Sequence, residues 1–102
     1  MRQTLVRVKN RVDEMAAIIK APIALLPTYE ISKDFAHPHI EIDNIGLYNY
    51  VIVERGHELE RKTTSNLNEL LYWIFRSVTF TMACDYELKN REIGLILRFS
   101  HQ

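Results

Sequence analysis

The sequence predicts an α+β fold in which an N-terminal helix precedes a three-stranded antiparallel meander and a long buried C-terminal helix. Three patterns support this prediction. Apolar residues recur at helical spacing near the N-terminus, residues 39–64 alternate like strands joined by glycine turns, and residues 67–90 are apolar on most sides. The 102 residues, 47% hydrophobic and 25% charged, have the size and composition of one globular domain over residues 1–102.

The first helix is expected over residues 3–20. Its buried face is predicted from residues three or four positions apart, namely Leu5, Val8, Val12, Met15 and Ile19. Pro22 is expected to end it, because proline disfavours helical backbone at the residue before it. The connector over residues 21–39 is expected to be irregular but packed on the domain. Its apolar side chains are Leu25, Leu26, Tyr29, Ile31 and Phe35.

Three strands are expected next, over residues 39–42, 47–54 and 57–64. Residues 43–46 (Asp-Asn-Ile-Gly) and the pair Arg55-Gly56 provide the turns, since glycine adopts positive φ without steric cost. On the middle strand Tyr48 and Tyr50 share one face. Leu59 is the only clearly apolar residue of the third strand, which is otherwise polar or charged, and this predicts that the strand lies at an edge of the sheet.

The last helix is expected over residues 67–90, with Gly94 able to end it. Asn66 is the expected N-cap and Glu69 is expected to reach back to it, although Ser65 is an alternative cap. Apolar residues cover most of the circumference: Leu67, Leu70, Leu71, Tyr72, Trp73, Ile74, Phe75, Val78, Phe80, Met82 and Ala83. The pattern predicts burial on more than one side, between the sheet and the first helix or in a subunit interface.

Charge and composition argue against several classes of protein. The net charge is zero, whereas nucleic-acid-binding domains usually carry a basic excess. No apolar run is long enough to span a bilayer, and the N-terminus lacks the uninterrupted apolar core of a signal peptide. The single cysteine, Cys84, cannot form an internal disulfide. We therefore expect a cytoplasmic protein with no nucleic-acid or membrane partner.

The histidines offer the only hint of enzyme chemistry. His37, His39 and His57, together with Glu41, would be acceptable zinc ligands for a small metal-dependent hydrolase. Their spacing matches no standard zinc motif, however, and the chain has neither a glycine-rich nucleophile turn nor a phosphate-binding loop. Surface histidines are the favoured interpretation. We expect no catalytic residue, no metal and no cofactor.

The charged turn at residues 54–58 (Glu-Arg-Gly-His-Glu) is the main candidate for a binding surface. Its side chains either contact a partner or tie the hairpin to a helix, and both interpretations remain open. Nearby tyrosines are either interface residues or cross-strand packing. The predicted partner-binding residues are Tyr48, Tyr50, Glu54, Arg55 and Glu58. Residues 29–54 carry one lysine against five acidic residues, which would attract a basic partner or form a solvated face.

Residues 48–60, the Thr63-Thr64 pair and residues 70–75 (Leu-Leu-Tyr-Trp-Ile-Phe) resemble the immunity-protein family numbered sixty-three of bacterial polymorphic toxin systems. The likeness covers roughly residues 40–91. It implies a non-catalytic inhibitor that binds and neutralises a cognate protein toxin in the cytoplasm of the producing cell. The motif positions are Tyr48, Glu54, Arg55, Gly56, Glu58, Tyr72 and Trp73.

The alternative hypothesis is a structural or interaction domain that self-associates. Trp73 and Phe80, with neighbouring apolar residues of the last helix, would then form the contact of a homodimer.

Overall fold

The N-terminal apolar stripe forms helix α1 (Gln3–Ile19), close to its predicted range. A computed structural model describes residues 3–32 and 34–100, with side chains as far as residue 91. Leu5, Val8 and Val12 are buried as predicted. Ile19 is 38% exposed, and Ala16 takes its place in the core because it lies one turn beyond Val12 on the same face.

The connector after α1 contains regular structure that was not predicted. A short 3-10 helix, η1 (Ile23–Leu25), precedes strand β1 (Thr28–Tyr29), which runs parallel to β2 (Pro38–Ile42). The sheet is therefore mixed and four-stranded, in the order β1-β2-β3-β4, and the prediction of three antiparallel strands is wrong in this respect. The expected packing of the connector is also wrong at two side chains, since Ile31 and Phe35 are 77% and 85% exposed.

The predicted meander forms the rest of the sheet. Strands β2, β3 (Tyr48–Glu54) and β4 (His57–Thr64) pair antiparallel, and β4 lies at the edge as expected. The β3–β4 register shifts between Ile52 and Val53, which indicates a β-bulge. A bulge locally bends and twists the strand that carries it.

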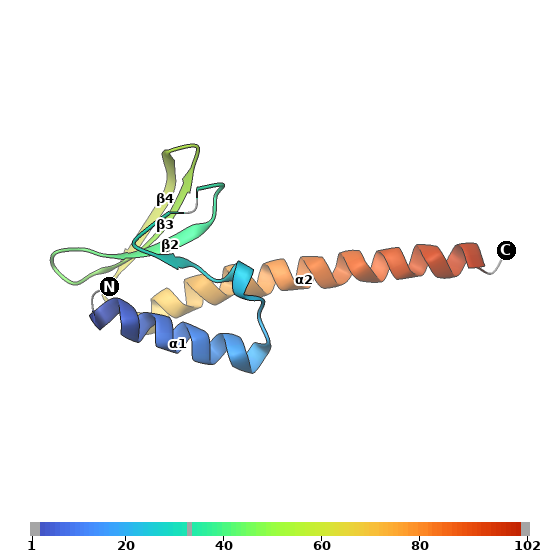
Figure 1. Ribbon diagram of the computed structural model, residues 1–102, viewed down its shortest axis with the longest axis horizontal. Helices are drawn as coiled ribbons and strands as arrows, with labels where there is room; N and C mark the ends of the chain where they lie inside the picture. Colours follow the sequence, from blue (N-terminus) through green and yellow to red (C-terminus); the bar gives the residue numbers. More distant parts are fainter. Residues whose placement is uncertain (1–2, 33, 101–102) are drawn as a thin grey trace.

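Helix α2 (Leu67–Ser100) is longer than predicted, and Gly94 does not end it. Its 34 residues correspond to a rod of about 50 Å. Only its first half is buried: Leu70, Ile74 and Val78 lie in the core, whereas every described side chain after Met82 is exposed. The prediction of a long buried helix therefore holds only for its first half, and the polar last turns are exposed. Figure 1 shows the second half extending beyond the sheet and α1.

The molecule has two layers, with α1 and the first half of α2 packed against the sheet (Figure 1). The core between them is built from Leu5, Val8, Val12, Ala16, Ile40, Tyr50, Leu70, Leu71, Ile74, Phe75 and Val78. None of the helices in the described part of the chain combines the length and hydropathy that a membrane span requires.

Asn66 is the N-cap of α2. Its Oδ1 accepts hydrogen bonds from the backbone N–H groups of Asn68 at 2.8 Å and Glu69 at 3.3 Å. The Asn66 N–H donates to Thr64 Oγ1 at 3.0 Å, a bond that takes the place of the predicted return contact from Glu69. The expected cap is confirmed, and the capping-box half of the prediction is not observed.

Replacing Asn66 with alanine is expected to lower the free energy of unfolding by about 1 kcal/mol, because two amides at the helix start lose their acceptor. Urea denaturation followed by circular dichroism measures this difference. Ser65→Ala is the matched control, since Ser65 is exposed and adjacent, and it should change the free energy by less than about 0.5 kcal/mol. Equal effects of the two substitutions would contradict the assignment.

Candidate functional site at the tip of the sheet

The β3–β4 hairpin turns through two residues, Arg55 and Gly56, between the paired Glu54 and His57. Their φ angles are +53° and +76°, so both residues are left-handed. Two consecutive left-handed residues are characteristic of the type I′ turn, whose twist matches that of the flanking strands. Glycine adopts this conformation freely, whereas arginine does so at a cost in backbone energy. The sequence therefore keeps an arginine where asparagine or glycine would be more stable.

Gly56→Ala is expected to lower the free energy of unfolding by about 1 kcal/mol, because a side chain at φ +76° is strained. No atom lies within 4 Å of the position of the new Cβ, so the loss would come from the backbone and not from a clash. Arg55→Asn should instead raise the free energy of unfolding by about 0.5 kcal/mol. Thermal or urea denaturation shows whether each substitution lowers or raises the free energy of unfolding. A Gly56→Ala variant as stable as the wild type would contradict the turn assignment.

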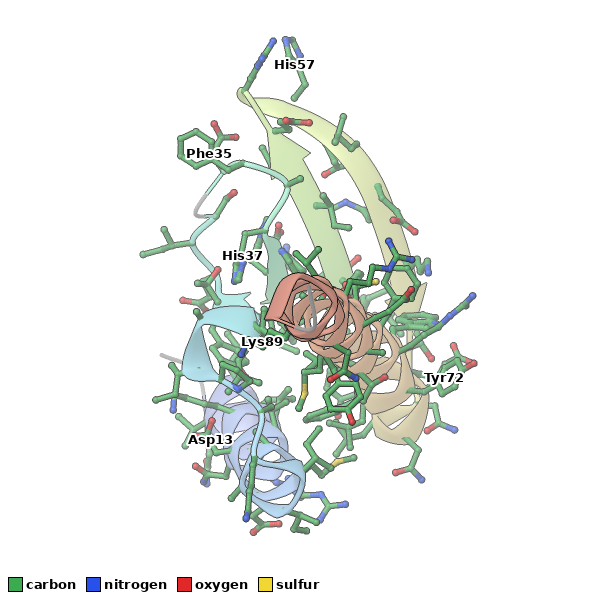
Figure 2. The ribbon with its side chains drawn as sticks, turned by 90° about the vertical axis from the view of Figure 1, so that its right-hand side faces the viewer. Asp13, Phe35, His37, His57, Tyr72 and Lys89 are labelled. Carbon is green, nitrogen blue, oxygen red and sulfur yellow. The ribbon has the colours of Figure 1, made fainter. Side chains whose placement is uncertain are left out.

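A second segment, residues 34–36, docks on this turn. Asp34 Oδ1 accepts a hydrogen bond from the Gly56 N–H at 3.2 Å, and the Ala36 N–H donates to the Val53 carbonyl at 3.0 Å. Phe35 lies between these two anchored residues, and its side chain is 85% exposed. Figure 2 shows Phe35 and His57 at the same end of the sheet. The docking therefore holds an exposed aromatic ring beside the charged turn.

The backbone of this segment is unusual. Asp34, Phe35 and Ala36 have φ angles of +61°, +56° and +62°. A left-handed conformation costs roughly 1–2 kcal/mol for each residue with a side chain, so these three are maintained by surrounding contacts such as the two hydrogen bonds to the hairpin. Strained backbone of this kind is concentrated at ligand-binding and switch regions.

The charged residues of the turn are exposed, and one of them is fixed by a strand neighbour. Glu58 Oε1 accepts hydrogen bonds from Arg61 Nη2 at 2.7 Å and Nε at 3.1 Å, and these bonds hold the pKa of the Glu58 carboxyl below its usual value. Arg61 also contacts Glu41 at 3.5 Å, and Glu41 contacts His39 Nε2 at 2.6 Å. The described contacts therefore tie Glu58 to its own sheet, and not to a helix. We call Phe35, Glu54, Arg55, His57 and Glu58 the tip surface.

The two predicted tyrosines are not part of the tip surface. Tyr50 is 4% exposed and packs in the core, where burial raises the pKa of its hydroxyl. Tyr48 is half-buried against the same core and starts β3, about 20 Å from Glu54 at the rise of an extended strand. The prediction that Tyr50 is an exposed partner contact is corrected by its burial, and of its two interpretations packing is the one observed.

Other positions of the motif that resembles the immunity-protein family make contacts within the fold. Lys62 Nζ lies 5.6 Å from the centroid of the half-buried Trp73 ring, within cation–π range. The Thr63 hydroxyl donates to Asn49 Oδ1 at 2.7 Å. Tyr72 differs, because its side chain is 62% exposed. Most of the motif outside the turn therefore stabilises the fold.

The histidines do not come together. His37 Nε2 lies 2.7 Å from the Leu26 carbonyl oxygen, His39 faces Glu41, and His57 is exposed at the tip. Within the described residues, no group of three or more histidine, cysteine, aspartate or glutamate side chains is arranged to hold a metal ion. Cys84 is exposed on α2.

Sequence reasoning missed Phe35 and Asp34. Phe35 was expected to pack on the domain because it is apolar, and no local pattern marks it as exposed. The contact that positions it joins Asp34 to Gly56, which are 22 residues apart. An aspartate close to a glycine turn in space, but distant along the chain, leaves no signal in one sequence.

Comparison with known families identifies a match for the second half of the chain. The model of a family described as Immunity protein 63 matches residues 43–96, which are 54 of the 102 residues. The matched range contains β3, the hairpin turn, β4 and most of α2, whereas α1, β1, β2 and Phe35 lie outside it. Comparison with curated proteins and with solved structures finds no match for the chain.

Proposed function

Because this chain belongs to the Immunity protein 63 family, we propose that it binds a cognate toxin of a bacterial polymorphic toxin system and neutralises it. The inhibition is stoichiometric and non-catalytic, and it takes place in the cytoplasm of the producing cell. The family match over the hairpin and α2 is the observation that carries this proposal.

The toxin contact is assigned to the tip surface. An aromatic ring beside charged side chains is the composition typical of binding hot spots, in which tyrosine, tryptophan and arginine are enriched and apolar anchors are surrounded by polar groups. Phe35 provides the apolar anchor, and Arg55 provides a guanidinium that can bind a carboxylate through two hydrogen bonds. Glu54 and Glu58 provide acceptors on either side of the turn.

The tip surface also suits tight binding because it is held in place before a partner arrives. The hydrogen bonds from Gly56 to Asp34 and from Ala36 to Val53 connect the two segments that carry it. The hydrogen bonds from Arg61 fix the Glu58 side chain within β4. A surface that is already ordered loses less conformational entropy on binding, so more of its contact energy appears as affinity.

The experiment is a growth assay in which this chain and the toxin encoded next to its gene are expressed from separately controlled promoters. A stoichiometric inhibitor should restore growth only when its amount equals or exceeds that of the toxin. Affinity-tagged toxin should also retain the chain in a pull-down. Absence of both binding and rescue would contradict the proposal, and full rescue at a small fraction of the toxin concentration would contradict the non-catalytic mechanism.

A further inference from the structure

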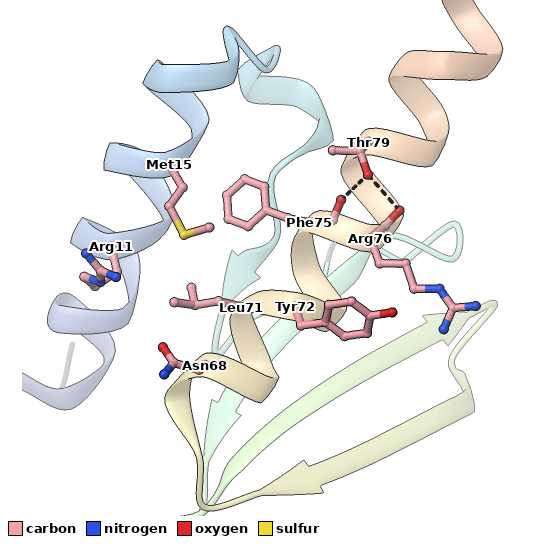
Figure 3. A pocket seen from close by; sticks show the side chains of 8 residues that line it. All are labelled: Arg11, Met15, Asn68, Leu71, Tyr72, Phe75, Arg76 and Thr79. Atoms are coloured by element: carbon pink, nitrogen blue, oxygen red, sulfur yellow. Dashed lines mark hydrogen bonds between the residues drawn. The ribbon is translucent and has the colours of Figure 1, made fainter.

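Helices α1 and α2 leave an open, mainly apolar groove of about 530 Å³ between them (Figure 3). Met15 of α1 points toward Phe75 of α2, and Leu71 lies beside them. Tyr72 and Arg76 line the side of the groove that lies away from α1. Tyr72 is 62% exposed, so the groove offers a large aromatic surface to solvent.

The groove face of α2 continues into its projecting half. Phe75, Thr79 and Tyr86 are separated by four and then seven residues, a spacing that places them along one side of a helix. Tyr86 is 70% exposed, and Ala83 between them is exposed as well. One stripe therefore starts in the groove and runs out along the part of α2 that packs on nothing else described.

The two halves of α2 are nearly equal in length. The 16 residues 67–82 pack on the body of the molecule, and the 18 residues 83–100 extend beyond it. An isolated helical segment of this length is only marginally stable in water, so a second surface against it would stabilise it. Two α2 helices side by side and antiparallel would place each projecting half on the groove half of the other.

Charge favours the same arrangement. Arg76 is exposed and forms no ion pair with another described residue. A two-fold axis between Thr81 and Met82 brings residue 76 opposite residue 87 of the second copy. Glu87 is exposed on α2, and among the described side chains its ion-pair partner is Arg91, one turn further along. Arg76 and Glu87 are eleven residues apart, about three helical turns, so both project from the same side of the stripe. In an antiparallel pair related by a two-fold axis, this side of one helix faces the same side of the other, so Arg76 of one copy faces Glu87 of its partner.

We propose that this stripe binds a second copy of the chain in an antiparallel, two-fold arrangement. Tyr86 of each copy lies over Phe75 and Thr79 of the other, and two Arg76–Glu87 pairs flank the contact. In such an isologous interface one patch serves both partners, so the pairing closes at a dimer. It goes beyond toxin binding, because Tyr72 of the groove and the tip surface lie at different ends of the sheet (Figure 2).

Sedimentation velocity of the full chain in reducing buffer tests the proposal. The wild-type chain should sediment as a dimer, and Tyr86→Glu should convert it to a monomer. Leu88→Glu is the matched control: Leu88 is 57% exposed and lies about 200° from Tyr86 around the helix, so this variant should remain dimeric. A wild-type chain that is monomeric at every concentration, or a Leu88→Glu variant that dissociates as readily as Tyr86→Glu, would overturn it.

A charge exchange tests the register. Arg76→Glu and Glu87→Arg should each raise the dimer dissociation constant about tenfold, because each alters two symmetry-related pairs. The double variant should restore affinity close to that of the wild type, although it still lacks the Glu87–Arg91 contact. A double variant that binds no more tightly than the single ones would contradict the proposed axis.

Discussion

Replacing Leu70 with alanine is expected to lower the free energy of unfolding by about 3 kcal/mol. Leu70 is fully buried where α2 meets the sheet and α1, so its removal costs both apolar burial and the contacts around the resulting cavity. Urea denaturation followed by circular dichroism gives the difference from the midpoint, provided that the slope of the transition is unchanged.

Leu88→Ala is the control for Leu70→Ala. It makes the same chemical change in the same helix, but Leu88 is 57% exposed, and its loss should change the free energy of unfolding by about 0.5 kcal/mol or less. Both variants should be compared at one protein concentration, because self-association would make stability depend on concentration. Similar losses for the two substitutions would show that the second half of α2 is buried after all.

Replacing Phe35 with alanine is expected to weaken binding of the cognate toxin by at least about tenfold. The ring is 85% exposed and its neighbours are anchored to the hairpin, so its removal deletes a contact without opening the core. The free energy of unfolding should change by less than about 0.5 kcal/mol. Isothermal titration calorimetry measures the affinity, and denaturation of the same sample confirms that folding is intact.

Ile45→Ala is the matched control for this variant. Ile45 is 81% exposed and lies between β2 and β3, at the opposite end of β3 from the turn. Its replacement should leave toxin affinity unchanged. If Phe35→Ala binds the toxin as tightly as the wild type, or if Ile45→Ala weakens binding equally, the tip surface is not the contact.

Features fixed by local chemistry were predictable from the sequence. Asn66 caps α2 because its side-chain oxygen reaches the first amides of the helix, and Arg55-Gly56 forms the turn because glycine accepts a left-handed backbone. The charge of β4 predicted its edge position for a similarly direct reason, since charged side chains require solvent on at least one side.

Features that depend on distant partners were not predictable. Strand β1 is two residues long, and it exists because Thr28 and Tyr29 pair with His39 and Ile40. Helix α2 looked buried because apolar residues surround it, but composition cannot distinguish a helix inside a core from one that projects with apolar residues exposed. Tyr86 and Phe80, at 70% and 69% exposure, are examples of the second kind.

The candidate site could be predicted only in part, because some of its residues are brought together by contacts between distant parts of the chain. The turn residues Glu54, Arg55 and Glu58 are exposed, as a charged turn suggests. Tyrosines next to charged residues are typical of interfaces, but a strand alternates its side chains between two faces, and Tyr50 lies on the buried one. Phe35 joins the site only through the contact between Asp34 and Gly56.

The central claim is that this chain neutralises a toxin by binding it. The most direct test is a titration of the purified toxin encoded next to its gene with the purified chain, in which complex formation and residual toxin activity are measured on the same samples. We predict a saturable complex with one chain for each toxin molecule, and loss of toxin activity that is complete at the same ratio. Absence of a complex, or a complex in which the toxin stays active, would contradict the claim.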